Sequence, residues 1–180
     1  MEFNKKDAKI FILSGKASSG KNAVSKIIEN YYKEKKCITI SFAYYLKDYA
    51  KRILNWDGNE NNKPRVFLQH LGIELIKNKI DNNLLINRIL QDIEVFSYFY
   101  DIIIISDARL IDEVESIKEK YSNSISIRLN RNNKDNYLTN SEKKHITETG
   151  LDNYQNFDYI LENNNYEHLI EQVENILRKV

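Results

Sequence analysis

Apolar residues recur along the chain with two spacings, one typical of strands and one typical of helices. Apolar residues spaced three and four apart predict helices, as over residues 24–31, and continuous or alternating apolar runs predict strands. Strands that alternate with helices favour an α/β fold, a doubly wound five-stranded parallel sheet covered by helices on both faces. The runs that predict strands are residues 10–13, 37–42, 101–109, 124–129 and 157–162.

Three segments add detail to this pattern. Residues 101–109, DIIIISDAR, are the most apolar run and are expected at the centre of the sheet, buried on both faces. Pro64, the only proline, is expected where a helix begins, and Leu68, Leu71, Leu75 and Ile76 continue one helix. Residues 130–147 are polar and without period, which predicts a mobile excursion. Nothing resembles a linker, so residues 1–180 are expected to form a single domain.

Composition narrows the function classes. The chain has 180 residues, of which 42% are hydrophobic and 29% are charged, as in ordinary globular proteins. Its net charge of +1 argues against a nucleic acid or an anionic membrane as partner. Cys37 is the single cysteine, which excludes an internal disulfide, and the first apolar run is too short for a signal peptide. A cytoplasmic protein is expected, and a homodimer is left open.

A glycine-rich motif follows the first predicted strand. The octapeptide GKASSGKN, residues 15–22, matches G-x-x-x-x-G-K between a strand and a helix, the context that a phosphate-binding loop requires. Backbone N–H groups and the helix N-terminus would then hold the phosphates of ATP. Lys21 should reach the β and γ phosphates. The ATP-binding candidates are Gly15, Lys16, Ala17, Ser18, Ser19, Gly20, Lys21 and Asn22.

Asn22 stands where the standard motif has a Ser or Thr hydroxyl for magnesium. Its amide oxygen can accept a hydrogen bond from a water bound to Mg²⁺ or coordinate Mg²⁺ weakly, and the contact through water is expected. The alternative is a residue at the helix start that satisfies its own backbone.

The segment SDAR forms a second candidate site. Asp107 is expected just past the buried strand, at the carboxyl edge of the sheet, where it would hold magnesium through water or accept a proton. Arg109 would clamp a phosphate with two hydrogen bonds. The alternatives are a helix N-cap for Asp107 and a surface ion pair for Arg109.

Further polar residues suit an acceptor pocket, although each one alone is also typical of a solvated surface. They are Lys47, Arg65, Gln69, Arg128 and Arg131. Tyr44 or Tyr45 could stack on a base, and His145 could contact phosphate, with an exposed loop histidine as its alternative. The sequence has no His/Cys cluster for zinc, no nucleophile elbow and no dinucleotide-binding glycine motif.

Several segments together resemble a known family. SGKASSGKN, SFAYYLKDYA, KPRVFLQHLG, IIISDARLIDEVESI and HITETGLDNYQNFDYILENN occur in the order seen in deoxynucleoside monophosphate kinases of the phage and bacterial type. Those kinases are similar to the animal-type phosphomevalonate kinases. The more specific motifs are D-x-R-x-x-x-E (Asp107, Arg109, Glu113) and T-E-x-x-L-D (Thr147, Glu148, Leu151, Asp152).

The resemblance implies a P-loop kinase with the adenylate-kinase-like fold, which uses ATP and Mg²⁺ to phosphorylate a nucleoside or deoxynucleoside monophosphate. It implies that Gly15 to Asn22 hold the ATP phosphates with Arg131, and that residues 130–147 form a short lid. Relatives often carry an acidic residue after the loop lysine, of which Asn22 is the amide counterpart. The alternatives are a phosphomevalonate kinase and a nucleotide-binding module without turnover. The implied acceptor side is Lys47, Arg65, Gln69, Asp107 and Arg109, and the implied catalytic residues are Lys21, Asp107 and Arg109.

Overall fold

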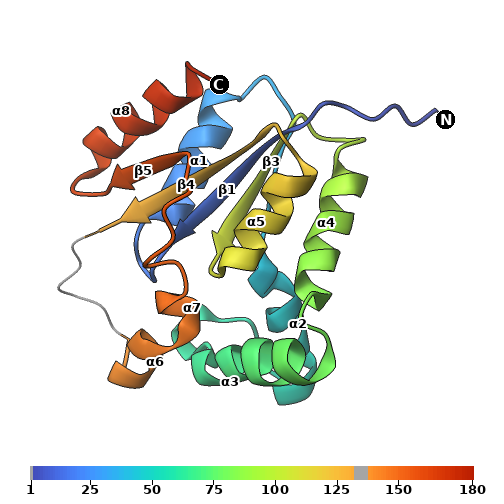
Figure 1. Ribbon diagram of the computed structural model, residues 1–180, viewed down its shortest axis with the longest axis vertical. Coiled ribbons are helices and arrows are strands. Elements are labelled where there is room, and N and C mark those ends of the chain that lie inside the picture. Colours follow the sequence, from blue (N-terminus) through green and yellow to red (C-terminus); the bar gives the residue numbers. More distant parts are fainter. Residues whose placement is uncertain (1, 132–137) are drawn as a thin grey trace.

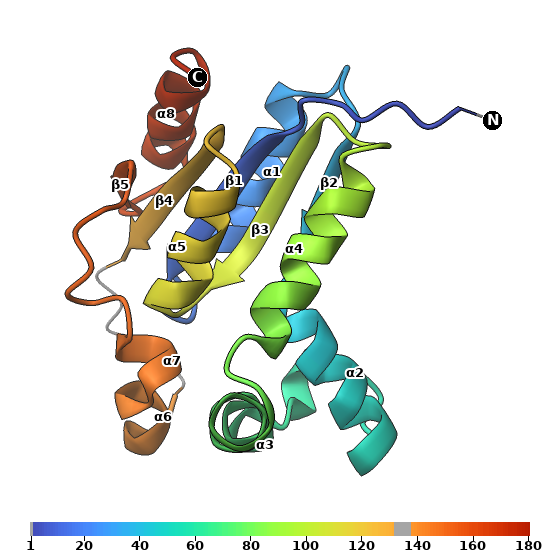
Figure 2. The same ribbon diagram turned by 45° about the vertical axis from the view of Figure 1, so that its right-hand side comes forward.

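The computed structural model describes residues 2–131 and 138–180. Its centre is a sheet of five parallel strands in the order β2–β3–β1–β4–β5 (Figures 1 and 2). This confirms the predicted α/β class and parallel sheet. The strands are β1 (Lys9–Gly15), β2 (Cys37–Ile40), β3 (Ile102–Ala108), β4 (Ser124–Asn130) and β5 (Tyr159–Glu162).

Helices cover both faces of the sheet and bury its two central strands. α1 (Lys21–Tyr31) and α8 (Tyr166–Leu177) share one core cluster with Phe11, Leu13 and Ile104. α4 (Leu84–Phe96) and α5 (Ile111–Lys120) share the other with Ile10, Ile12 and Ile103 (Figure 2). β1 is the middle strand and β3 lies beside it, buried on both faces as expected. In the described part of the chain, no helix has the length and apolar character needed to cross a membrane.

A group of helical segments lies beyond the carboxyl ends of the strands (Figure 1). They are α2 (Phe42–Leu54), η1 (Glu60–Asn62), α3 (Arg65–His70) and η2 (Leu71–Ile80). α3 begins directly after Pro64, as predicted. The helix continues through Leu75 and Ile76 as predicted, but from Leu71 on it is the π-helix η2 and not an α-helix. Hydrogen bonds to residue i−5 change which residues share a face, so Leu75 is 45% exposed while Leu71 and Ile76 are buried.

Residues 138–149 form two short helices, α6 (Asn140–Lys144) and α7 (Ile146–Thr149). The polar segment 130–147, predicted to be a mobile excursion, thus contains helical residues after position 139 and begins with the last residue of β4. Residues 132–137 lie outside the described residues, and the mobility of the segment stays a prediction. The Glu142 carboxylate accepts the backbone N–H of Thr139 at 2.8 Å, and the Thr139 hydroxyl accepts that of Glu142 at 3.3 Å. Such capping boxes start helices too short to show an apolar period.

Candidate active site

The loop between β1 and α1 is closed tightly by its two glycines. Gly15 has φ +153° and Gly20 has φ +106°, conformations that residues with a side chain rarely adopt. A Cβ at Gly15 would lie 2.4 Å from Ser19 Oγ and 2.7 Å from the carbonyl oxygen of Leu129. A Cβ at Gly20 would lie 2.3 Å from Asn163 Nδ2. The loop path thus requires glycine at both positions, as a phosphate-binding loop does.

The Lys21 side chain is buried and folds back into this loop. Its ammonium group donates to the carbonyl oxygens of Gly15 at 2.6 Å and Lys16 at 2.9 Å. Burial, together with the positive charge of Arg109, lowers the pKa of Lys21 to about 7. The ammonium group is therefore short of negative charge in this state, and a bound phosphate would supply it.

Asp107 lies at the end of β3, not beyond it, and holds the start of α2. Its two carboxylate oxygens accept the backbone N–H groups of Phe42 at 2.8 Å and Ala43 at 2.9 Å. The N-cap alternative thus applies to α2, a helix distant in sequence, and not to the helix that follows Asp107. These contacts also explain why β2 stops at Ile40 and does not continue through Phe42. Asp107 fixes α2 relative to the carboxyl edge of the sheet.

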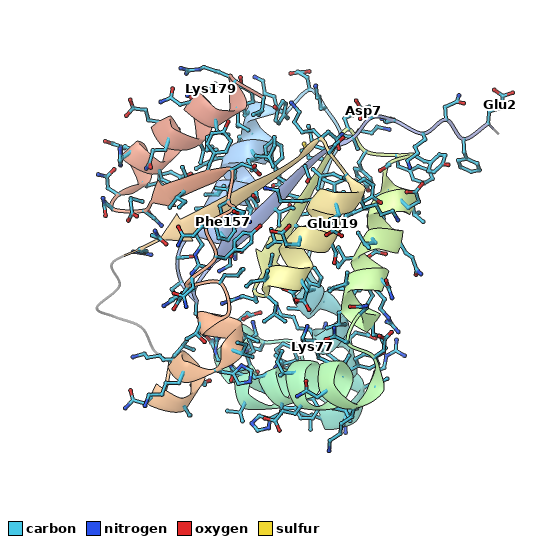
Figure 3. The ribbon with its side chains drawn as sticks, in the orientation of Figure 1. Glu2, Asp7, Lys77, Glu119, Phe157 and Lys179 are labelled. Carbon is cyan, nitrogen blue, oxygen red and sulfur yellow. The ribbon has the colours of Figure 1, made fainter. Side chains whose placement is uncertain are left out.

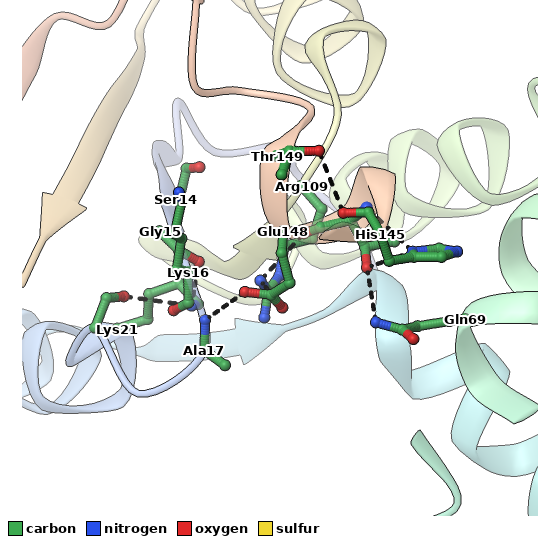
Figure 4. A network of polar contacts seen from close by, with 12 residues as sticks. Ser14, Gly15, Lys16, Ala17, Lys21, Gln69, Arg109, His145, Glu148 and Thr149 are labelled. Carbon is green, nitrogen blue, oxygen red and sulfur yellow. Dashed lines mark hydrogen bonds and ion pairs between the residues drawn. The ribbon is translucent and has the colours of Figure 1, made fainter. Parts of the chain in front are cut away.

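Arg109 forms an ion pair with a buried partner from α7 (Figure 4). Its Nη1 donates to Glu148 Oε1 at 2.7 Å and to the carbonyl oxygen of Thr147 at 3.2 Å. Glu148 Oε2 accepts the backbone N–H of Ala17, in the phosphate loop, at 2.8 Å. The Glu148 side chain is 8% exposed, so the alternative of a surface ion pair for Arg109 is wrong. Glu148 belongs to the T-E-x-x-L-D motif, but nothing in the sequence pointed to this contact.

Glu113 holds the backbone next to Arg109. Its Oε2 accepts the N–H of Arg109 at 2.7 Å and the N–H of Leu110 at 3.1 Å. Burial raises the pKa of Glu113 to about 8, although the two N–H donors oppose this shift. The third residue of the D-x-R-x-x-x-E motif is therefore a structural support for the second.

Glu113 predicts a specific dependence of stability on pH. Because its pKa in the folded state is above that in the unfolded state, the folded protein binds more protons between about pH 4.5 and 8. Stability contributed by this group is therefore lost as pH rises through that window. Relative to Glu113→Gln, the free energy of unfolding of the wild type should fall by up to about 1.4 kcal/mol per pH unit. Urea denaturation at pH 5, 6, 7 and 8 measures the difference, and Glu119→Gln on the exposed face of α5 is the control. Parallel wild-type and Glu113→Gln profiles would contradict the assignment.

A cavity of ≈ 490 Å³ lies between the phosphate loop and the helical segments α2, α3 and η2. It brings together residues that the sequence assigned to the ATP side and to the acceptor side. Lys47 is held by Glu60 at 2.7 Å, and Gln69 Nε2 donates to Thr147 Oγ1 at 3.4 Å. The predicted residues that line the cavity are Ala17, Ser18, Lys21, Asn22, Lys47, Arg65, Gln69, Asp107 and Arg109.

The cavity also contains polar residues that the sequence analysis did not single out. Lys63 is 18% exposed and pairs with Glu60 at 3.0 Å. Lys77 of η2, labelled in Figure 3, pairs with Asp112 of α5. In the sequence, Lys63 and Lys77 are ordinary charged residues. The one feature that could have pointed to a site residue was the position of Lys63 beside Pro64. The other polar lining residues that the sequence analysis did not single out are Ser41, Glu60, Asn82 and Ser106, whereas Glu113, Thr147 and Glu148 were named only as members of the family motifs.

A second hollow of ≈ 430 Å³ lies on the other side of the loop, and Lys16, Arg128 and Arg131 line it. Asp152 accepts from Lys16 Nζ at 2.8 Å and from Arg128 Nη2 at 3.1 Å. Arg131 Nη1 donates to the carbonyl oxygen of Ser18 at 3.2 Å. Arg131 therefore lies against the loop that the sequence assigned to the ATP phosphates.

Tyr44, Tyr45 and His145 line neither of these two cavities. Tyr44 is 66% exposed, and Tyr45 hydrogen-bonds Asp92 while Arg88 packs over its ring. His145 Nδ1 accepts the N–H of Thr147 at 3.3 Å and thereby caps α7. The structure therefore offers no support for base stacking by the two tyrosines or for a phosphate contact by His145.

The family model for deoxynucleotide monophosphate kinases matches residues 39–175. The chain belongs to this family. It is therefore an ATP-dependent kinase of nucleotide monophosphates, as the resemblance implied. The matched range begins after the phosphate loop and gives no evidence about it. The assignment of residues 15–22 as a phosphate loop rests on their glycine geometry instead. No curated protein sequence matches the chain.

Solved structures similar to this kinase share its fold. A Janibacter sugar kinase has a TM-score of 0.58 at 10% identity, with 95% of each chain covered. The APS kinase of Mycobacterium tuberculosis has a TM-score of 0.55 at 12% identity, with 96% of this chain and 99% of that chain covered. The shikimate kinase of Bacteroides thetaiotaomicron has a TM-score of 0.54 at 13% identity, with 94% and 98% covered. These likenesses confirm the P-loop kinase fold.

Proposed function

We propose that this kinase transfers the γ-phosphoryl group of Mg-ATP to a deoxynucleoside monophosphate in the cavity of ≈ 490 Å³. One observation carries the proposal: the same cavity is lined by Lys21 and Asn22 of the loop and by Lys47, Arg65 and Gln69 beyond it. Donor and acceptor phosphates would therefore meet beside Asp107 and Arg109, within one enclosed space. Phosphoryl transfer requires such alignment of the attacking and leaving oxygens.

The walls of the cavity suit a nucleotide better than a small branched acid. Leu46, Leu68, Ile73, Ile76 and Ile86 supply an apolar surface for a flat base, and Lys47, Lys63 and Arg65 supply cations for its phosphate. The volume falls in the range of about 300–1,000 Å³ typical of small-molecule sites. Phosphomevalonate has a phosphate but no base, and it would leave the apolar surface uncovered.

The chain's residues position and neutralise the reactants. Lys21 neutralises charge on the β and γ phosphates, and Arg109 and Arg131 bind phosphate oxygens. Asp107 keeps α2, which carries Lys47, in place through its contacts with Phe42 and Ala43. The lid expected over residues 130–147 stays a prediction, and residues 132–137 of it lie outside the described residues. No covalent intermediate with a side chain is needed.

The available oxygen atoms fit magnesium. The Asn22 amide oxygen and the Asp107 carboxylate are hard oxygen donors, which Mg²⁺ prefers, and both residues line the cavity. Each Asp107 oxygen already accepts a backbone N–H, so we assign it a contact through water. Bound Mg²⁺ would neutralise negative charge on the ATP phosphates. Asn22 and Asp107 would hold it in the same cavity as Lys21.

An acceptor panel tests this proposal. ADP release from Mg-ATP is measured with ribo- and deoxyribonucleoside monophosphates and with phosphomevalonate. We expect kcat/KM for one or more deoxynucleoside monophosphates to exceed that for the matching ribonucleotide and for phosphomevalonate by at least about 10-fold. Turnover with phosphomevalonate alone would overturn the acceptor assignment. ATP binding without any product would instead support a nucleotide-binding module.

We also propose, from the sequence alone, a cytoplasmic location and small-molecule partners with no nucleic acid. A homodimer stays an open prediction. Light scattering with size-exclusion chromatography, with and without ATP, measures the oligomeric state.

A further inference from the structure

Three groups that would bind phosphate already have partners inside the protein (Figure 4). The backbone N–H of Ala17 donates to Glu148 at 2.8 Å, and Arg109 Nη1 donates to the same carboxylate at 2.7 Å. The Lys21 ammonium donates to the carbonyl oxygens of Gly15 and Lys16. A bound nucleotide must therefore replace internal contacts in this region.

The Glu148 carboxylate has the chemistry of a phosphate at this position. It offers two anionic oxygens, one to a loop N–H and one to a guanidinium, the donors that phosphate oxygens use. Its side chain is 8% exposed, so both interactions are largely shielded from water. A phosphate oxygen and this carboxylate could not occupy the same donors, because each would bring negative charge into a poorly solvated space.

The helix that carries this carboxylate, α7, ends close to the backbone of Arg109. A Cβ at Gly150, directly after α7, would lie 2.8 Å from the carbonyl oxygen of Ile146 and 3.1 Å from that of Arg109. α7 thus packs closely against the backbone that carries Arg109. Withdrawal of Glu148 from Ala17 therefore requires movement of the Glu148 side chain, of α7, or of both.

We propose that Glu148 is a tethered anion that occupies part of the phosphate site without nucleotide and gives way to a phosphate oxygen when nucleotide binds. This rests on the proposed nucleotide site. In this exchange Arg109 loses its hydrogen bond to the Glu148 carboxylate and donates to an oxygen of the incoming phosphate instead. The apparent nucleotide affinity is then the intrinsic affinity multiplied by the fraction of molecules in which Glu148 is withdrawn. Nucleotide binding and the position of α7 are thereby coupled.

Glu148→Gln tests the exchange. The amide keeps an oxygen that can accept the Ala17 N–H but loses the negative charge that competes with phosphate. Binding of Mg-ATP and Mg-ADP, measured by isothermal titration calorimetry without acceptor, should become about 10-fold tighter. Glu148→Asp keeps the charge and shortens the reach by one methylene group. It should fall between the wild type and Glu148→Gln, and it also serves if the glutamine variant does not fold.

Asp152→Asn is the matched control. Asp152 lies in the same segment, but within the described residues its carboxylate accepts from the side chains of Lys16 and Arg128 and not from a backbone N–H of the loop. A smaller gain in affinity than that of Glu148→Gln supports the exchange. An equal gain overturns it, because the effect would then come from removal of any nearby negative charge.

Unchanged or weaker Mg-ATP binding by Glu148→Gln, with lowered kcat, would mean that Glu148 stays in place and only positions Arg109. If the wild type binds no nucleotide, the proposed function fails and this inference fails with it. If it binds and the variants do not differ, this inference fails alone.

Discussion

Lys21→Ala lowers kcat/KM for Mg-ATP by about 10³-fold or more, the largest effect expected for any single side chain. The ammonium group is buried in the loop and lies within hydrogen-bond distance of two backbone carbonyl oxygens. It would exchange these neutral acceptors for charged phosphate oxygens, whose negative charge grows on the leaving group during transfer. Alanine supplies no charge to replace it. Coupled-assay kinetics over a range of ATP concentrations measure the loss.

The titration of Lys21 gives a second measurement of the same role. Its pKa is lowered to about 7 in this state, so part of the population is neutral at pH 8. A bound phosphate raises that pKa, so nucleotide binding at pH 8 should take up protons, and affinity should fall as pH rises above 7. Calorimetry in buffers of different ionisation enthalpy measures the uptake. Lys26→Ala, at an exposed position of α1, should keep the uptake and the rate. Full turnover or unchanged proton uptake in Lys21→Ala would contradict the role.

The strands and the phosphate loop could be predicted because their signals are local. Residues 102–105 are four consecutive isoleucines in a strand buried on both faces, a pattern that requires no distant information. Gly15 and Gly20 likewise mark positions where a Cβ would collide with neighbouring atoms. Asp107 and Arg109 could be proposed because they stand at the end of that buried strand, and the family motif D-x-R-x-x-x-E agrees with this choice.

The contacts that organise the site could not be predicted because they are not local. Glu148 lies 131 positions from Ala17 and 39 from Arg109. Asp107 caps a helix 64 and 65 positions away. Neither pairing has a spacing rule, since each depends on how separate elements pack at the carboxyl edge of the sheet. The π-helical turns of η2 also have no signal in an apolar pattern written for α-helices.

Arg109→Ala should lower kcat/KM by about 10²- to 10³-fold and also destabilise the protein. Its guanidinium is one of the cations beside the proposed transferred phosphoryl group, where a lost charge-assisted hydrogen bond weakens transition-state binding. Its removal also leaves Glu148, whose side chain is 8% exposed, without its ion-pair partner. An unpaired carboxylate in such a site costs about 1–3 kcal/mol of stability. Arg109→Lys keeps the charge but not the planar pair of donors, and should lose about 10-fold in rate.

The double variant Arg109→Ala with Glu148→Gln separates the two effects. Since the glutamine is neutral, it removes the uncompensated charge that Arg109→Ala leaves behind, so urea denaturation should show stability recovered toward that of the wild type. The rate should stay low, because no guanidinium faces the phosphates. Arg178→Ala, which breaks an exposed pair with Glu174 on α8, should change neither stability nor rate by a measurable amount. If the double variant regained the wild-type rate, Arg109 would serve only to neutralise Glu148, and the phosphate would depend on Lys21 and the loop N–H groups for its binding.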